Sequence, residues 1–321
     1  LAGFVGRRQA VACASGTDAL QLALLAFGIG AGDEVITTPF TFIATAETIA
    51  LCGAKPVFVD IEERTFNLDP EKLAGALTAR TRAIVAVDLY GHPAAYDEIS
   101  AFAAEHGLKL IEDAAQSLGA DYHGRRCGSF GDLSATSFFP AKPLGCYGDG
   151  GMLFTDDEEM AATLRCLRNH GQKKRYYHEA IGCNSRLDTL QAAVLLVKLT
   201  HFPEEITRRN QVAETYSRAL ADNFSIPVVE DDCRSVFAQY TLRSRRRERV
   251  LAELGEAGIP YAIHYPVPLH LQPAFAGLGY GPGDFPVAEK IAGEVFSLPM
   301  HPFLDGETQS RIIETLKQCT S

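Results

Sequence analysis

Lys142 stands where a lysine could form an imine with a carbonyl compound. It lies between Pro140 and Pro143, directly after the β-prone run 134–139 and before a glycine-rich turn. The prolines restrict the backbone, so such a loop can hold its lysine beside the end of a buried strand. Burial lowers the pKa of an amine and makes it a better nucleophile. A solvated surface lysine is the alternative interpretation of this residue taken alone.

A candidate phosphate site begins at Ser15. The sequence Ser15-Gly16-Thr17-Asp18 follows a short β-prone run and opens a helical segment. Free backbone N–H groups and a hydroxyl at a helix start bind phosphate. The alternative is ordinary helix capping, in which Asp18 favours the helix dipole.

Glu112 and Asp113 directly follow the strand-like run 109–111. Two acids at the end of a buried strand are costly unless something pairs with them. A protonated ring nitrogen is one such partner, because a carboxylate keeps the ring protonated as an electron sink. The alternative is a carboxylate that caps the following helix.

These groups need a common scaffold, and the first half of the chain predicts a parallel sheet. Short β-prone runs alternate with helical segments, predicted at 17–27, 43–51, 70–77 and 94–106, which is typical of α/β proteins. The apolar run 83–87 fits a strand buried on both faces. In such sheets ligands bind at the carboxyl ends of the strands, where the acids and the lysine follow. The predicted strands are 11–14, 34–38, 56–59, 82–89, 108–112, 133–139 and 151–155.

Helical periodicity dominates the second half of the chain, with long helices predicted at 157–169 and 187–220 and shorter ones at 248–257 and 308–317. Strand-like pieces such as 237–242 lie between them. We therefore predict a large domain at 1–205 and a smaller C-terminal α+β domain at 206–321.

The order of these signals resembles the DegT/DnrJ/EryC1/StrS family of sugar aminotransferases. The resemblance runs over essentially the whole chain. It implies a type I aspartate-aminotransferase fold with a mostly parallel, seven-stranded-type sheet, and pyridoxal 5'-phosphate as cofactor. The family carries a further segment before the position of Leu1, so we expect that an N-terminal segment is missing. The matching segments are 16–20, 112–116, 137–142, 148–151 and 184–188.

The resemblance implies a role for each matching residue at the cofactor. Lys142 would form the imine and shuttle protons, Asp113 would pair with the ring nitrogen, and Gln116 would bond the ring hydroxyl. Phe42 would lie against the ring, although a core aromatic is the alternative. The residues implied around the phosphate are Gly16, Thr17, Asp18 through its backbone, and Ser137.

Four more residues are implied at the substrate side. Asn184 resembles the residue that reaches the phosphate in the neighbouring subunit, which implies a homodimer with shared active sites. Arg186 would then meet an anionic substrate group, with a structural ion pair as the alternative. His264 and Tyr265 resemble the family's substrate loop.

The implied reaction uses glutamate to form pyridoxamine 5'-phosphate, which then aminates a nucleotide-linked keto-sugar. The segments around Lys142 and Arg186 most resemble enzymes that aminate UDP-2-acetamido-2-deoxy-3-oxo-glucuronate for surface polysaccharides such as O-antigen. A 4-keto-6-deoxy sugar nucleotide is an alternative substrate. A sugar dehydratase of the same fold would replace the lysine with histidine. A non-catalytic cofactor-binding regulator is the alternative from a different class.

Composition and charge argue against several kinds of binding partner. The net charge is −10, which argues against nucleic acid or an anionic membrane surface as the main partner. No apolar run approaches the length of a membrane span. The eight cysteines include no CxxC pair, so a reducing compartment, the cytoplasm, is predicted. The histidines and cysteines have no metal-ligand spacing, so no metal site is predicted.

Overall fold

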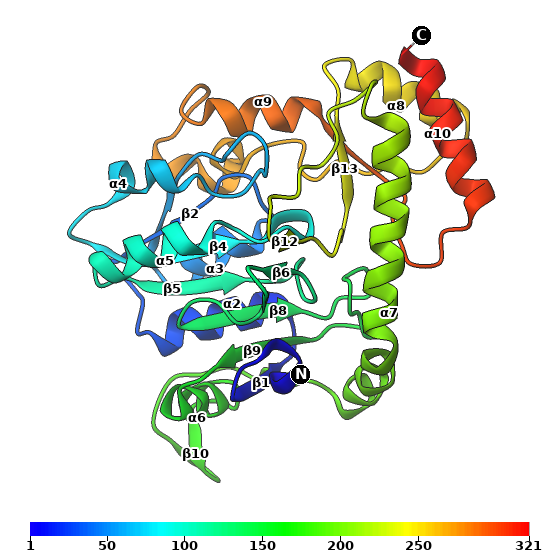
Figure 1. Cartoon of the computed structure of the whole chain (residues 1–321). Coiled ribbons are helices and arrows are strands. Elements are labelled where there is room, and N and C mark those ends of the chain that lie inside the picture. Colours follow the sequence, from blue (N-terminus) through cyan, green and yellow to red (C-terminus); the bar gives the residue numbers. More distant parts are fainter. Residues whose placement is uncertain (321) are drawn as a thin grey trace.

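The centre of the molecule is a seven-stranded sheet (Figure 1). The computed structural model describes residues 1–320 of the chain. The pairs β2–β3, β2–β4, β4–β5 and β5–β8 are parallel, whereas β9 runs antiparallel to both β1 and β8. The predicted mostly parallel α/β sheet is therefore confirmed. In spatial order the strands are β1 (Gln9–Cys13), β9 (Gly151–Thr155), β8 (Leu133–Ser137), β5 (Lys109–Asp113), β4 (Thr81–Val87), β2 (Glu34–Thr37) and β3 (Lys55–Phe58).

Helices cover both faces of this sheet. The helices α2 (Gly16–Ala26), α3 (Ala44–Leu51) and α6 (Glu158–Leu167) bury their apolar side chains in one core cluster. The opposite face packs against α5 (Tyr96–Glu105) and the first half of α7 (Thr189–Leu220) in a second cluster. The sheet is thus buried on both sides, as its apolar strands predict.

Alternation along the strands decides which face each side chain meets. In β4, Ala83 and Val85 belong to the α2 side, whereas Ile84 and Ala86 belong to the α5 side. Residue 110 of β5 lies on the α5 side and residue 111 on the α2 side. The two acids that follow therefore point in opposite directions, Glu112 toward α5 and Asp113 toward α2 and α3.

The C-terminal part has a core of its own. Figure 1 shows α7 running past the sheet and up to α8 (Arg247–Glu256) and α10 (Gly306–Thr320). The second half of α7 packs with these helices and with the antiparallel pair β13 (Tyr240–Arg243) and β14 (Val295–Leu298). The predicted domain boundary near residue 205 falls inside α7, and the division into two domains stays a prediction.

Two predicted elements differ from those observed. The expected helix at 70–77 is a 3₁₀ turn (Pro70–Lys72) followed by the four-residue α4 (Leu73–Ala76). The expected strand at 237–242 begins only at Tyr240, because Phe237 takes a left-handed conformation with φ 45°.

Within residues 1–320, no helix is both long enough and apolar enough to cross a bilayer. The remaining elements are α1 (Ala2–Val5), β6 (Asp121–Tyr122), β7 (Arg125–Arg126), β10 (Gln172–Lys174), β11 (Tyr177–His178), β12 (Cys233–Arg234), α9 (Pro286–Glu294) and 3₁₀ turns at Leu89–Gly91, Leu269–Leu271 and Pro273–Leu278.

Candidate active site

A cavity of about 520 Å³ lies at the carboxyl ends of β4, β5 and β8. This is the edge of the sheet where an α/β protein binds its ligands. The cavity brings together residues that are up to about 250 positions apart in the chain. The predicted site residues that line it are Gly16, Thr17, Phe42, Asp113, Gln116, Ser137, Lys142, His264 and Tyr265. Asp18, Asn184 and Arg186 lie elsewhere.

The start of α2 and the end of β8 form one wall of the cavity. Gly16 and Thr17 precede the first backbone bond of α2, which Ala19 N–H donates to Ser15 O at 3.0 Å. Their amides thus belong to the unpaired first turn of a helix. A Cβ at Gly16 would lie 2.6 Å from Ser137 Cβ, so only glycine allows Ser137 to approach the helix start this closely. This cradle suits a phosphate.

Asp18 differs from the expectation. Its backbone N–H donates to Ser15 Oγ at 3.0 Å, which is the capping arrangement considered as the alternative. Its carboxylate accepts a bond from Ser185 Oγ at 2.6 Å and so faces the segment before α7. Asp18 therefore serves to dock that segment on α2, and its amide is engaged by the cap.

Asp113 is a buried acid at the cavity. Thr45 Oγ1 donates to its carboxylate at 2.8 Å, and Ala115 N–H donates at 3.2 Å. Burial raises the pKa of Asp113, and these two donors and the charge of Lys142 act against the rise. Few donors face this carboxylate, so a cationic group in the cavity would stabilise its charge.

Lys142 lies in the same cavity, on the loop after β8. Burial lowers the pKa of Lys142, and the charge of Asp113 acts in the other direction. The loop is held by Lys142 N–H, which donates to Phe139 O at 2.8 Å, and by Cys146 N–H, which donates to Phe138 O at 2.8 Å. The sequence therefore places an amine with a lowered pKa on a fixed loop, and the solvated alternative is excluded by its position.

Gln116 is held at both ends of its amide. Tyr90 N–H donates to Gln116 Oε1 at 2.8 Å, and Gln116 Nε2 donates to Tyr265 Oη at 3.4 Å. Tyr90 Oη also donates to the backbone oxygen of His264. The site residues from the first and second halves of the chain are thus joined in one network.

Phe42 is 51% exposed, so the alternative of a core aromatic is wrong. Its ring lies 6.2 Å from that of Tyr265 at the cavity wall. His264 Nδ1 lies 3.1 Å from Ser297 Oγ, and burial together with the charge of Lys142 lowers the pKa of His264. Both effects disfavour the protonated form of His264.

Asn184 and Arg186 are exposed and flank the buried Ser185. Ser185 Oγ accepts a bond from Ala14 N–H at 3.0 Å and donates to Asp18, which fixes this segment against the start of α2. Arg186 Nη1 donates to Asn169 Oδ1 at 3.4 Å. Within the described chain no carboxylate lies within 4 Å of Arg186, so the structural ion pair considered as its alternative is not formed.

Three further residues matter here, although the sequence analysis assigned none of them a role. Thr45 and Ser185 hold Asp113 and Asp18 through their hydroxyls. Tyr90 holds Gln116 through its backbone N–H. Each lies 20 or more positions from the residue that it holds. Their contacts depend on the assembled sheet.

The cavity residues fit pyridoxal phosphate. They combine a glycine-dependent phosphate cradle, a buried carboxylate for a ring nitrogen, and an amine whose pKa is lowered. The family model of the DegT/DnrJ/EryC1/StrS aminotransferases matches residues 1–317. The chain belongs to this family.

Similar proteins of known name or structure agree with this membership. The chain is 54% identical over 306 residues to UDP-2-acetamido-2-deoxy-3-oxo-D-glucuronate aminotransferase from Pseudomonas aeruginosa, covering 95% of this chain and 84% of the relative. A DegT/DnrJ/EryC1/StrS aminotransferase from Brucella abortus superimposes with a TM-score of 0.97 at 45% identity, covering 100% of this chain and 88% of the other. Protein Spr1654 from Streptococcus pneumoniae, solved in PLP and PMP forms, gives a TM-score of 0.93 at 28% identity over 99% and 88% of the two chains.

Four predictions are confirmed by these findings: the family, the type I aminotransferase fold, the pyridoxal phosphate cofactor and the transaminase class. The individual site roles rest on the geometry given above and stay predictions.

Gly16→Ala should weaken binding of pyridoxamine phosphate, because the added methyl would push Ser137 away from the helix start. We expect the Kd to rise about tenfold, the equivalent of one lost charge-assisted hydrogen bond, in an absorbance titration of the apoprotein. Gly75→Ala, whose added methyl meets nothing within 4 Å, is the control. Equal affinities for both variants would show that phosphate binds elsewhere.

The reactivity of Lys142 should depend on Asp113. In the apoprotein, labelling of Lys142 by a small amine reagent should rise with pH around a midpoint below the ordinary 10.5, because burial lowers its pKa. Asp113→Asn removes a charge that favours the ammonium form, so it should move that midpoint to lower pH. Quantitative mass spectrometry, with the exposed Lys173 as internal reference, measures both. A higher midpoint in the variant would contradict the electrostatic coupling.

Proposed function

We propose that this aminotransferase transfers the amino group of glutamate to the keto carbon of UDP-2-acetamido-2-deoxy-3-oxo-glucuronate. The observation that carries the proposal is a cavity that holds Lys142, Asp113 and the Gly16–Ser137 cradle together. The Pseudomonas relative, 54% identical, bears the name of that reaction. The product would serve the assembly of a surface polysaccharide such as O-antigen.

Each residue has a part in this reaction. The bound cofactor supplies an electron sink for the carbon that loses or gains the proton. Lys142 Nζ would hold the cofactor at its carbonyl carbon and would move the proton, which its lowered pKa favours. Asp113 would keep the ring nitrogen protonated, Gln116 would bind the ring hydroxyl, and Phe42 would cover the ring.

Lys142 also bears on the alternative reactions. A dehydratase of this fold would carry histidine at position 142, and a regulator without catalysis would not need an amine with a lowered pKa in the cavity. These observations favour transamination over both alternatives.

We further propose a homodimer in which each active site uses residues from both chains. Asn184 and Arg186 do not line the cavity of their own chain, although they match the family's phosphate and substrate residues. Large apolar side chains are exposed in the first half of α7, among them Leu190 (80%) and Leu196 (70%), with Ile181 (94%) nearby in sequence. Such exposed apolar groups are typical of a surface that another subunit covers.

The eight cysteines are unpaired, which supports the cytoplasm as the location.

Arg186 provides the test of the substrate. A planar guanidinium binds a carboxylate through two parallel hydrogen bonds, an interaction worth about 1.5–3 kcal/mol, or roughly tenfold to a hundredfold in kcat/KM. Arg186→Ala should therefore lower kcat/KM by that factor for the 3-oxo-glucuronate nucleotide. The matched substrate with a hydroxymethyl group in place of the C6 carboxylate should lose much less.

Arg186→Lys is the companion variant, since it keeps the charge but loses the planar fork, and it should retain part of the discrimination. Equal losses on the two substrates would remove the argument for a uronate. A neutral keto-sugar nucleotide, such as a 4-keto-6-deoxy sugar, would then be the better candidate.

Mixed dimers test the shared site. If Asn184 acts on the partner's cofactor, a heterodimer of Lys142→Ala and Asn184→Ala has one site with both defects and one site with neither. Each heterodimer should then recover about half of the wild-type activity. Tagged subunits and native mass spectrometry establish that exchange has occurred. Exchanged dimers without recovery would place Asn184 in its own chain's site.

A further inference from the structure

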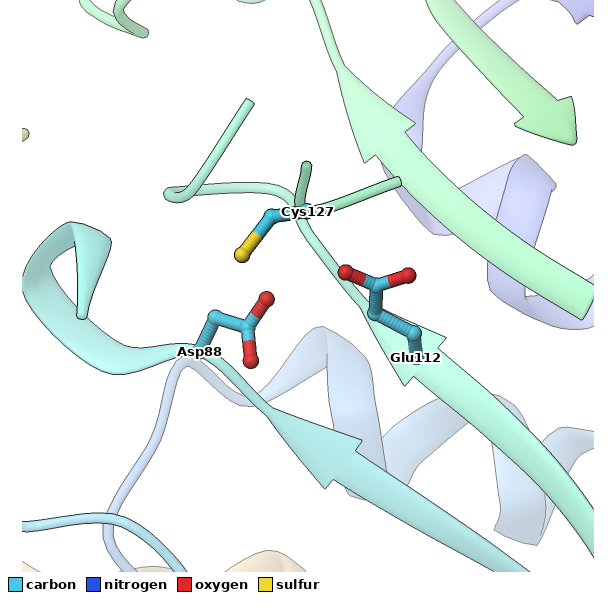
Figure 2. A group of neighbouring side chains, drawn as sticks. All are labelled: Asp88, Glu112 and Cys127. Atoms are coloured by element: carbon cyan, nitrogen blue, oxygen red, sulfur yellow. The ribbon is translucent and has the colours of Figure 1, made fainter. Parts of the chain in front are cut away.

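Asp88 follows β4 directly and is fully buried beneath the cavity, on the α5 side of the sheet. Figure 2 shows its carboxyl group pointing toward Glu112 of β5 and Cys127 of the loop after β7. Ligand-type atoms of these three side chains all lie within 4.8 Å of one another. None of the three lines the active-site cavity, so the reaction leaves them unexplained.

The carboxyl oxygens of Asp88 and Glu112 already accept hydrogen bonds. Asp88 Oδ1 accepts from Ala94 N–H at 2.9 Å and from Tyr96 Oη at 2.7 Å, and its Oδ2 accepts from Ser117 Oγ at 2.6 Å. Glu112 accepts from Gly128 N–H at 2.7 Å and Phe130 N–H at 2.8 Å. A metal ion would have to compete with all of these donors, so the cluster suits a proton rather than a metal.

Asp88 and Glu112 are adjacent buried acids, and burial raises the pKa of both. Burial raises the pKa of Asp88 to about 6, against the effect of its Ser117, Ala94 and Tyr96 donors. Burial and the nearby Asp88 raise the pKa of Glu112 well above its ordinary range. Burial and proximity therefore both act against two adjacent buried charges in this pair.

Asp88 contacts both ends of the turn that carries the cofactor residues. Its backbone N–H donates to Asp113 O at 3.2 Å, and its carboxylate holds the hydroxyl of Ser117. Asp113 and Gln116, the two groups placed at the cofactor ring, lie within this five-residue segment. Asp88 also begins the turn in which Tyr90 N–H binds Gln116 Oε1.

We propose that Asp88 is a positioning residue for the cofactor, which holds the Asp113–Ser117 turn so that Asp113 and Gln116 face the pyridine ring. It acts from the opposite side of the sheet through Ser117 and the backbone of Asp113. The inference depends on the cofactor and on the ring contacts proposed above for Asp113 and Gln116. It does not depend on the identity of the sugar.

The test is binding of pyridoxamine phosphate, which requires the ring contacts but no bond to Lys142. Ser117→Ala cuts the link between Asp88 and the turn and should raise the Kd about threefold to tenfold, with a smaller cofactor-induced rise in Tm. Ser129→Ala is the matched control. It removes a bond of 2.6 Å, to Arg126 O, from a buried serine in the neighbouring loop. Its Kd should stay within about twofold of wild type.

A purely structural role would lower the Tm of the apoprotein in both variants and leave both Kd values unchanged. That outcome would overturn the proposal. Because no sugar is present in this assay, its result does not depend on the substrate proposal. Turnover with glutamate alone in half-reactions separates failure of cofactor positioning from failure of sugar recognition.

Asp88→Asn provides a second measurement if Ser117→Ala does not fold. The amide oxygen can still accept hydrogen bonds from Ala94 N–H and Tyr96 Oη. The new amide N–H can donate to the oxygen of the Ser117 hydroxyl. We expect Asp88→Asn to bind pyridoxamine phosphate within a few-fold of wild type and Asp88→Ala to bind it about tenfold more weakly or worse. Equal affinities for Asn and Ala would contradict the proposed role.

Discussion

The buried carboxylate of Asp113 is the constraint on which the active site depends. A carboxylate out of water is stable only beside donors or a cation, and here Thr45 and Ala115 supply the donors while Lys142 supplies the charge in the same cavity. The same burial that raises the pKa of Asp113 lowers that of Lys142. One apolar environment thus makes the acid ready for a cationic ring and the amine ready to attack a carbonyl.

The sheet creates this environment through the alternation of its strands. Consecutive residues of β5 point to opposite faces, so Asp113 enters the cavity while Glu112 enters the core below it with Asp88. Parallel neighbours then place the ends of β4 and β8 beside Asp113. The helix start at Gly16 joins them because the glycine allows contact with Ser137. A cofactor site therefore follows from strand order and from two residue types, glycine and a buried acid.

Much of this could be predicted from the sequence because the relevant patterns are local. The apolar runs indicated the strands, with β9 at its predicted bounds, and the spacing of acid, lysine and helix start indicated the edge where they meet. The parts that were missed depend on distant contacts. The hydroxyls of Thr45 and Ser185 bind acids 68 and 167 positions away. A lone threonine or serine carries no pattern that identifies its partner before the chain folds.

The most direct test of the account is the identity of the lysine that attaches the cofactor. Borohydride reduction of the protein loaded with pyridoxal phosphate, followed by peptide mapping, should place the adduct on Lys142. Lys142→Ala should lose the adduct and turnover while still binding pyridoxamine phosphate through the Gly16–Ser137 cradle and Asp113. An adduct on another of the lysines in wild-type protein would contradict the assignment of the cavity as the active site.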